Sequence, residues 1–227
     1  MKLRARKFLV RLDDLVPHEG TENLRVKRLV TSIQELGAVL KPVIVDSRTK
    51  LVIDGHHRVA ALKALGARYV PAIVVDYRAE IGRIESFTYV LAGDSDLISR
   101  LAKSLVSEVD GSGHLPVALS VHSRGTEELL SVRADLTYVL EIIADMASKH
   151  KLRCIKVAPV GSITLAELRA GDDDWTSWLA IKPKLITHDA VFETLRRGAE
   201  FPPRTTYHVT SLKHVRAPVK LEYLLKP

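Results

Sequence analysis

The most informative stretch of the chain is Asp-Gly-His-His-Arg at residues 54–58. It follows an apolar, β-branched run and opens a segment rich in small residues, which is typical of a turn between a strand and a helix. A helix start presents backbone N–H groups without intrahelical acceptors and a partial positive charge, and two histidines and an arginine add to that charge. The segment therefore predicts an anion site, with phosphate as the anion.

The familiar phosphate and metal motifs do not describe this segment. The chain contains neither G-x-x-x-x-G-K-[ST] nor G-x-G-x-x-G. His56 and His57 are adjacent, so on a helix they project about 100° apart and do not readily chelate one ion. Cys154 is the single cysteine, which excludes both a zinc site of several cysteines and an internal disulfide framework.

Three further segments carry residues able to do chemistry. Glu19 lies in a polar Pro-His-Glu-Gly loop and, taken alone, is typical of a solvated carboxylate. Lys41 precedes a proline and fits a phosphate contact and a surface lysine equally well. Residues 204–208, Arg-Thr-Thr-Tyr-His, offer a cation, hydroxyls and a histidine after a rigid double proline, which indicates a binding loop.

Composition narrows the class of protein. The 227 residues are 46% hydrophobic and 27% charged, which predicts a globular protein of one large domain or two small ones. No apolar stretch approaches the roughly 18 residues of a membrane span, and we expect a cytoplasmic protein with no membrane partner. The net charge of +7 fits nucleic acid or a small anionic ligand, but no run of five basic residues occurs. Scarce Asn, Gln, Cys and Met suggest an organism from a hot environment.

Hydrophobic periodicity predicts the elements that hold these residues. The first part of the chain is expected to form strands at 7–12, 42–45, 51–53 and 69–77 and helices at 24–36 and 56–65. Gly37 and Gly66 supply the helix stops.

A second unit is expected to follow the first. Its predicted elements are helices at 95–106, 127–150 and 189–197 and strand-like segments at 115–121, 152–157, 178–181 and 221–225. The fold class is therefore α/β (α+β), with domains at 1–85 and 86–227.

Four separated segments together resemble the archaeal free L-serine kinases of the ParB/sulfiredoxin-like superfamily. They are residues 16–19 (Val-Pro-His-Glu), 41–42 (Lys-Pro), 53–58 (Ile-Asp-Gly-His-His-Arg) and 205–208 (Thr-Thr-Tyr-His). The resemblance implies a ParB/sulfiredoxin-like N-terminal domain, a second smaller α/β domain, and an active site in the cleft between them. It also implies phosphate transfer from ATP or ADP, with Mg²⁺, to the hydroxyl of L-serine.

The resemblance also implies roles for individual residues. Glu19 takes the place of the general base, and the nucleotide phosphates are held by Asp54, Gly55, His56, His57 and Arg58. Asp54, the one acid among these, is also suited to assist proton transfer or to hold a metal. No residue is assigned to Mg²⁺ beyond that.

Substrate and adenine contacts follow from the same resemblance. Thr205, Thr206 and His208 are expected to contact L-serine, and Lys41 is grouped with them. Tyr89 is the expected neighbour of the adenine ring. Tyr207 stands where the family pattern has a basic residue, which puts in doubt a substrate or phosphate contact at this position.

Two relatives in the same superfamily give alternative functions. A sulfiredoxin needs a cysteine in the phosphate loop, and Cys154 lies far from it. A ParB-type nucleotide-dependent DNA-binding protein pairs a G-x-x-R loop with a downstream E-N-x-x-R helix; residues 55–58 satisfy the first pattern, whereas Glu-Asn-Leu-Arg at 22–25 lies upstream with its arginine one place early. We therefore expect a kinase that binds no nucleic acid and is a monomer or homodimer, with the DNA-binding protein as the alternative.

Overall fold

Separate hydrophobic cores organise the described residues. The computed structural model describes residues 6–113, 115–123, 126–157, 177–183 and 186–226. Contacts divide the chain into two units. Unit 1 comprises residues 1–84, 187–204 and 208–227, and unit 2 comprises residues 85–186 and 205–207. Contacts thus group most of the last forty residues with the N-terminal unit, whereas the sequence pattern places them in a second domain at 86–227.

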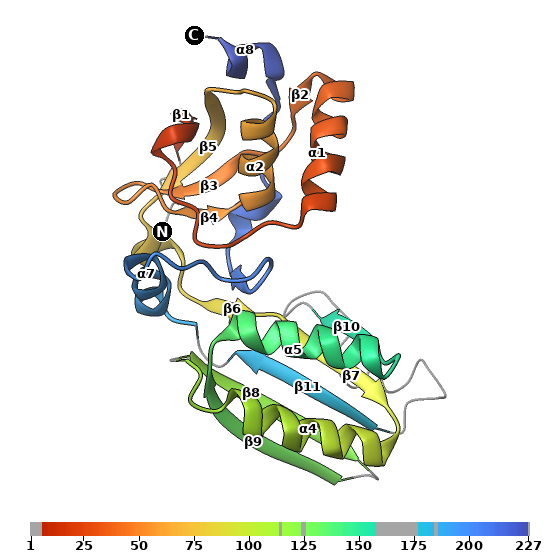
Figure 1. The fold of residues 1–227 in the computed structure, drawn as a ribbon. Helices are drawn as coiled ribbons and strands as arrows, with labels where there is room; N and C mark the ends of the chain where they lie inside the picture. Colours follow the sequence, from red (N-terminus) through yellow and green to blue (C-terminus); the bar gives the residue numbers. More distant parts are fainter. Residues whose placement is uncertain (1–5, 114, 124–125, 158–176, 184–185, 227) are drawn as a thin grey trace. The chain divides into compact units, whose positions relative to one another are not determined.

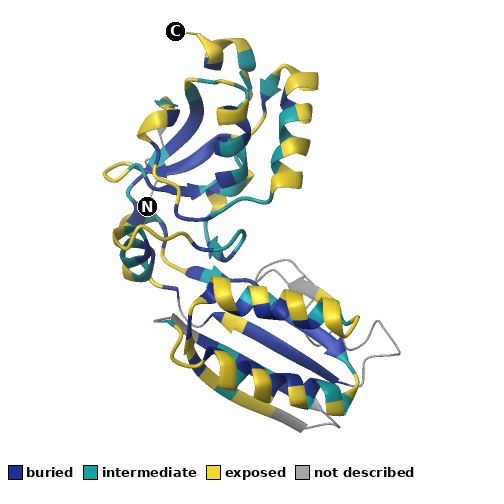
Figure 2. Ribbon diagram, in the orientation of Figure 1, coloured by how far each residue is buried: buried dark blue, intermediate teal, exposed yellow. Residues whose placement is uncertain are grey.

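Unit 1 is built on a four-stranded mixed sheet (Figure 1). Its strands, in spatial order, are β1 (Arg6–Arg11), β5 (Tyr69–Val75), β3 (Val43–Asp46) and β4 (Val52–Asp54). β5 runs parallel to β3 and antiparallel to β1, and β3 forms a hairpin with β4. β3 is buried along its whole length (Figure 2).

Two helices, α1 (Asn23–Leu36) and α2 (His56–Ala64), lie side by side in unit 1 (Figure 1). α1 ends at Gly37, whose φ of 61° is the left-handed conformation expected of a helix stop. Ile33 of α1 and Leu62 of α2 enter the same core as the sheet residues Val43 and Val52. The predicted strand–turn–helix around residues 51–65 is confirmed.

Short elements complete unit 1. They are the 3-10 helices Leu12–Asp14 and Ser211–His214, α3 (Tyr77–Glu80), α7 (His188–Arg196), the paired strands β2 (Ala38–Val39) and β13 (Val219–Lys220), and α8 (Leu221–Leu225). The expected strand at 221–225 is wrong, because Leu221 and Leu224, three residues apart, both enter the core, as one face of a helix does. β6 (Ile84–Ser86) pairs with β12 (Thr206–His208), and the division between the units crosses both strands.

Unit 2 is a five-stranded antiparallel sheet with helices on one face (Figure 1). The strands, in spatial order, are β10 (Arg153–Val157), β7 (Thr88–Gly93), β11 (Ser177–Pro183), β8 (Leu115–Ser123) and β9 (Thr126–Ala134). The helices are α4 (Ser95–Val109) and α5 (Leu136–Lys149). Successive residues of β7 and β11 alternate between the face of the sheet that packs on these helices and the opposite face, as the two-residue period of a strand requires.

The helix expected at 127–150 is wrong over its first third. β9 occupies that part, with Val132 and Ala134 buried and Leu129 74% exposed, which is the alternation of a strand. Asp135 then caps α5 by accepting a hydrogen bond from the backbone N–H of Tyr138 at 3.0 Å. The capping aspartate is the boundary that hydrophobic spacing alone did not reveal.

Within the part of the chain that the structure describes, no helix is long and apolar enough to span a membrane.

Candidate functional site

The segment at 54–58 forms the predicted junction between β4 and α2. Gly55 is the N-cap of α2 and has φ 104°, a conformation that L side chains rarely adopt. A Cβ atom at Gly55 would lie 2.8 Å from Val43 Cγ1 and 2.9 Å from Arg58 Nη2. Glycine is therefore required here both by backbone conformation and by space. Because glycine has no side chain to cap the helix, the first-turn N–H groups of α2 stay suited to an external anion.

Arg58 folds back over Gly55 and joins the two halves of the loop. Its guanidinium pairs with the Asp54 carboxylate, donates to the Lys41 carbonyl at 3.1 Å and also donates to the Pro42 carbonyl. The structure therefore brings together the 41–42 and 54–58 segments that the sequence singled out. The Lys41 side chain itself is exposed, so its contribution to this joint is its backbone carbonyl.

His57 connects the start of α2 to the start of α1. Its Nε2 accepts a hydrogen bond from the backbone N–H of Glu22 at 3.0 Å and lies 3.7 Å from a Glu22 carboxylate oxygen. Glu22 is the N-cap of α1. The starts of α1 and α2 are thus joined beside the predicted phosphate loop.

His56 turns into the interior. The residue is 7% exposed, and its Nε2 lies 3.2 Å from Nδ1 of His18, which is fully buried. The backbone N–H of His56, at the start of α2, is therefore the part of this residue suited to a phosphate, while its imidazole packs in the core.

Glu19 is 6% exposed and held by the tail of unit 1. A carboxylate oxygen accepts a hydrogen bond from the backbone N–H of Arg204. On either side of Glu19, His18 and Gly20 exchange backbone hydrogen bonds with Phe201, at 2.9 and 2.8 Å. The predicted base is therefore fixed by contacts about 185 residues away in sequence.

The predicted serine-binding tail is divided. His208 belongs to unit 1 and is 1% exposed, with Nε2 2.8 Å from the Tyr77 hydroxyl. Thr205, Thr206 and Tyr207 group with unit 2. Thr205 is 1% exposed, and its carbonyl accepts a hydrogen bond from the Phe87 N–H at 3.4 Å.

Tyr89, the expected adenine neighbour, lies on β7 in the core of unit 2. It is 8% exposed and packs in the cluster that includes Leu101 of α4 and Ile142 of α5. Hydrophobic packing of unit 2 accounts for the burial of this tyrosine. Its place beside an adenine ring stays a prediction.

Lys213 is the residue that sequence reasoning missed. It lies in the 3-10 helix Ser211–His214 and is partly buried, which lowers its pKa. Asp54 and Glu19 act electrostatically to raise that pKa and Arg58 to lower it, so the ammonium group lies among these three charges. A single lysine five residues beyond His208 carries no motif, and no sequence signal could have identified it.

The buried histidines are held neutral. Burial lowers the pKa of His18 to about 4, against an opposing hydrogen bond to the Val52 backbone. Burial, followed by repulsion from His18, lowers the pKa of both His56 and His208 well below the ordinary value. These side chains therefore serve as neutral hydrogen-bonding groups near neutral pH.

Among the described residues, no group of three or more His, Cys, Asp or Glu side chains could hold a metal ion. Asp54, the acid of the phosphate loop, is engaged by Arg58. The described side chains therefore provide no metal site made of protein groups alone.

Comparisons with known proteins agree with the sequence resemblance. The ParB N-terminal domain family matches residues 10–85. The chain is 36% identical over 220 residues to an ATP-dependent L-serine kinase of Staphylothermus marinus, across 88% of this chain and 84% of that protein. It is 24% identical over 230 residues to an ADP-dependent L-serine kinase of Thermococcus kodakarensis, across 95% and 91% of the two chains. A solved structure of a mutant free serine kinase in complex with AMP has the same fold, with TM-score 0.71, 21% identity, and coverage of 99% of this chain and 95% of that one.

We predict that the free energy of unfolding falls between pH 7 and pH 5. The unfolded chain takes up protons at its histidines near the ordinary pKa of 6.5, whereas folded His18 does so only near 4, so stability is full above the first value and is lost as the pH falls toward the second. His18 alone should cost about 2 kcal/mol over this interval. Urea denaturation followed by circular dichroism at the two pH values measures the loss.

The matched variants are His18→Gln, which should flatten this pH dependence, and His214→Gln at an exposed position, which should retain it. Equal free energies of unfolding at both pH values for the unmodified protein would show that the histidines are not buried and neutral.

Proposed function

The chain belongs to the family of ATP- and ADP-dependent L-serine kinases, and we propose that it transfers the terminal phosphate of ATP or ADP to the hydroxyl of free L-serine. The product is O-phospho-L-serine. The observation that supports the assignment of residues is that unit 1 holds both the Gly55 turn, where Arg58 pairs with Asp54, and Glu19, whose carboxylate accepts the Arg204 N–H. The charge of Lys213 interacts electrostatically with Asp54, Arg58 and Glu19.

The donor phosphates are bound at the start of α2. Its backbone N–H groups, reinforced by the helix dipole, donate hydrogen bonds to the phosphate oxygens, and Gly55 permits the close approach of these oxygens. Arg58 is already paired with Asp54 and two carbonyls, so its first role is to hold the loop in shape. Asp54 keeps Arg58 in place and contributes to the charge balance around the phosphates.

Glu19 is the general base. As the serine oxygen bonds to the terminal phosphorus, the bond from that phosphorus to the leaving ADP or AMP breaks, and the hydroxyl proton passes to the Glu19 carboxylate. The carboxylate is suited to this step because the Arg204 N–H fixes one oxygen. A positioned base needs no further motion at the moment of transfer.

Lys213 neutralises charge on the transferred group. Phosphoryl transfer depends on positioning and on stabilising charge spread over the equatorial oxygens of the phosphoryl group. Lysine is a compact point charge on a flexible stem, so it is able to follow the group from donor to serine. Its electrostatic interaction with both Glu19 and Asp54 matches that path.

Mg²⁺, which the sequence resemblance implies, would come with the nucleotide, because this ion favours phosphate oxygens and water over a site made only of protein groups. When bound, it would neutralise phosphate charge. Thr206, which is partly exposed, remains a proposed contact of the serine substrate, because a hydroxyl group suits the ammonium and carboxylate groups of that substrate. The contact of Thr205 with serine stays a prediction from the sequence resemblance.

We predict that the purified protein, given L-serine and Mg²⁺, forms O-phospho-L-serine with ATP, with ADP or with both. The relatives differ in donor, so the two nucleotides are tested in parallel by phosphorus-31 NMR, with reactions lacking serine as the control. Absence of product with either donor would overturn the proposal. A duplex DNA shift that requires nucleotide and weakens with salt would instead support the ParB-like alternative.

We predict that Glu19→Gln lowers kcat by about 100-fold or more, because the amide cannot accept the hydroxyl proton. Nucleotide affinity should change less than about twofold, since the α2 start is untouched. Steady-state kinetics and calorimetric titration measure the two quantities. Glu35→Gln, an exposed change on α1, is the matched control and should leave both unaltered. An active Glu19→Gln enzyme would remove this residue from the role of base.

We predict that Lys213→Met, which keeps the length of the side chain but removes its charge, lowers kcat about 100-fold. Lys220→Met is the control, because Lys220 is largely exposed and pairs with Glu222 outside the site. If Lys213→Met raises only the KM of the nucleotide and leaves kcat unchanged, the lysine serves binding and not transfer.

A further inference from the structure

A line of buried aromatic and imidazole rings runs through unit 1 beside the proposed site. His56 contacts His18, His18 faces His208 with ring centroids 5.4 Å apart, and His208 contacts Tyr77. Tyr77 also packs edge-on against His188 of α7 at 4.5 Å. Four of these five rings, those other than His188, are at most 7% exposed, so they serve the interior of unit 1.

Hydrogen bonds join this line of rings to the backbone. His18 bonds the Val52 backbone, its Nδ1 lies 3.2 Å from His56 Nε2, and its own backbone N–H donates to the same His56 nitrogen at 3.5 Å. His208 bonds the Ile53 backbone, so its Nε2 accepts from the Tyr77 hydroxyl at 2.8 Å. Burial raises the pKa of that hydroxyl, which keeps it a donor.

The two backbone partners are consecutive residues of β4, the strand that leads into the phosphate loop. His18 directly precedes Glu19, and His56 is the first residue of α2. The ring network therefore joins the base, the strand before the loop, and the helix that presents the phosphate-binding N–H groups. A chain of satisfied hydrogen bonds in a dry interior favours a single arrangement of the groups that it joins.

Tyr77 anchors the far end of the network. Its backbone N–H donates to the Asp46 carboxylate at 2.9 Å, and Asp46 also accepts two hydrogen bonds from Thr49, at 2.8 and 2.7 Å. Burial alone would raise the pKa of Asp46, but these hydrogen bonds outweigh it and lower the pKa, so the carboxylate stays charged. The Tyr77 hydroxyl is thus presented from a fixed backbone position at the end of β5.

We propose that Tyr77 and His208 are positioning residues of the phosphoryl transfer: through His18, they hold Glu19 at a fixed place relative to the start of α2. The inference rests on the proposed kinase function and assigns to His208 a role different from the serine contact that the sequence resemblance implies. The burial of His208 within unit 1 and its bonds to Tyr77 and β4 support the positioning role.

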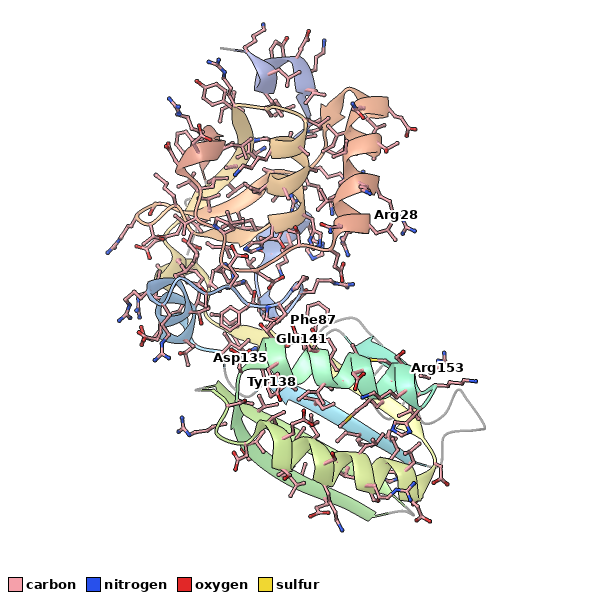
Figure 3. The ribbon with its side chains drawn as sticks, in the orientation of Figure 1. Arg28, Phe87, Asp135, Tyr138, Glu141 and Arg153 are labelled. Atoms are coloured by element: carbon pink, nitrogen blue, oxygen red, sulfur yellow. The ribbon has the colours of Figure 1, made fainter. Side chains whose placement is uncertain are left out.

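The test is Tyr77→Phe, which removes one oxygen atom and keeps the ring that packs on His188. We expect kcat to fall about tenfold, with the KM values for L-serine and nucleotide changed less than about twofold, because alignment is lost and binding is not. The matched control is Tyr138→Phe on α5 (Figure 3), whose hydroxyl bonds Glu108 at 3.2 Å in unit 2 and should leave kcat unchanged.

A second measurement does not need activity. The backbone N–H of Gly20, which donates to the Phe201 carbonyl at 2.8 Å, should exchange with solvent about tenfold faster in Tyr77→Phe if the network holds this loop. Proton NMR should also show a raised pKa of His208, since the hydroxyl that favours its neutral form is gone. The other groups that act electrostatically on the His208 ring, His18, Lys213 and His188, are the same in both proteins.

Unaltered kcat and unaltered Gly20 exchange in Tyr77→Phe would overturn the proposal. So would a His208→Gln variant that raises only the KM of L-serine, because that result marks direct substrate contact. If the unmodified protein makes no phosphoserine, the kinase proposal fails, and the exchange rate of Gly20 still decides whether the network positions this loop.

Discussion

The left-handed turn at Gly55 is the constraint on which the rest of unit 1 depends. It lets β4 end and α2 begin within one residue, and it leaves the space in which the Arg58 guanidinium lies. Arg58 in turn holds Asp54 and the carbonyls of the 41–42 segment. A side chain at residue 55 would strain the backbone and also displace this guanidinium. One glycine therefore supports both the shape of the phosphate loop and its charge balance.

In unit 1, burial decides which side chains carry a charge as much as residue type does. Three histidines close to the loop are kept uncharged by the interior, and the arginine of the loop is paired with an aspartate. In the proposed site, the positive charge offered to a phosphate comes from helix N–H groups and from Lys213, which interacts electrostatically with Asp54, Glu19 and Arg58. Residues of the same basic type therefore have different roles: the buried histidines and Arg58 hold the proposed site in shape, whereas Lys213 is proposed to act on the phosphate.

The sequence predicted local features well and distant ones poorly. The β4–α2 junction was predictable because an apolar run, a glycine turn and a helical period lie within fifteen consecutive residues. The strand at β9 was missed because its leucines also fit a helical period, and only burial separated exposed Leu129 from buried Val132. The contact between Glu19 and Arg204 spans 185 positions and leaves no local pattern. Lys213 and the burial of His208 depend on that same long-range folding.

Unit 1 contains both the beginning and the end of the described chain, with unit 2 encoded between them. β13 pairs with β2, and Leu224 of α8 enters the same core as Leu12. Residues 187–204 and 208–226 of unit 1 are therefore synthesised after nearly all of unit 2. Unit 2 has nearly all of its strands and helices in one continuous stretch and is able to fold earlier, as domains generally do during synthesis. The buried Glu19 loop acquires its contacts with Phe201 and Arg204 only after those residues have been made, so the proposed base is fixed late in the folding of unit 1.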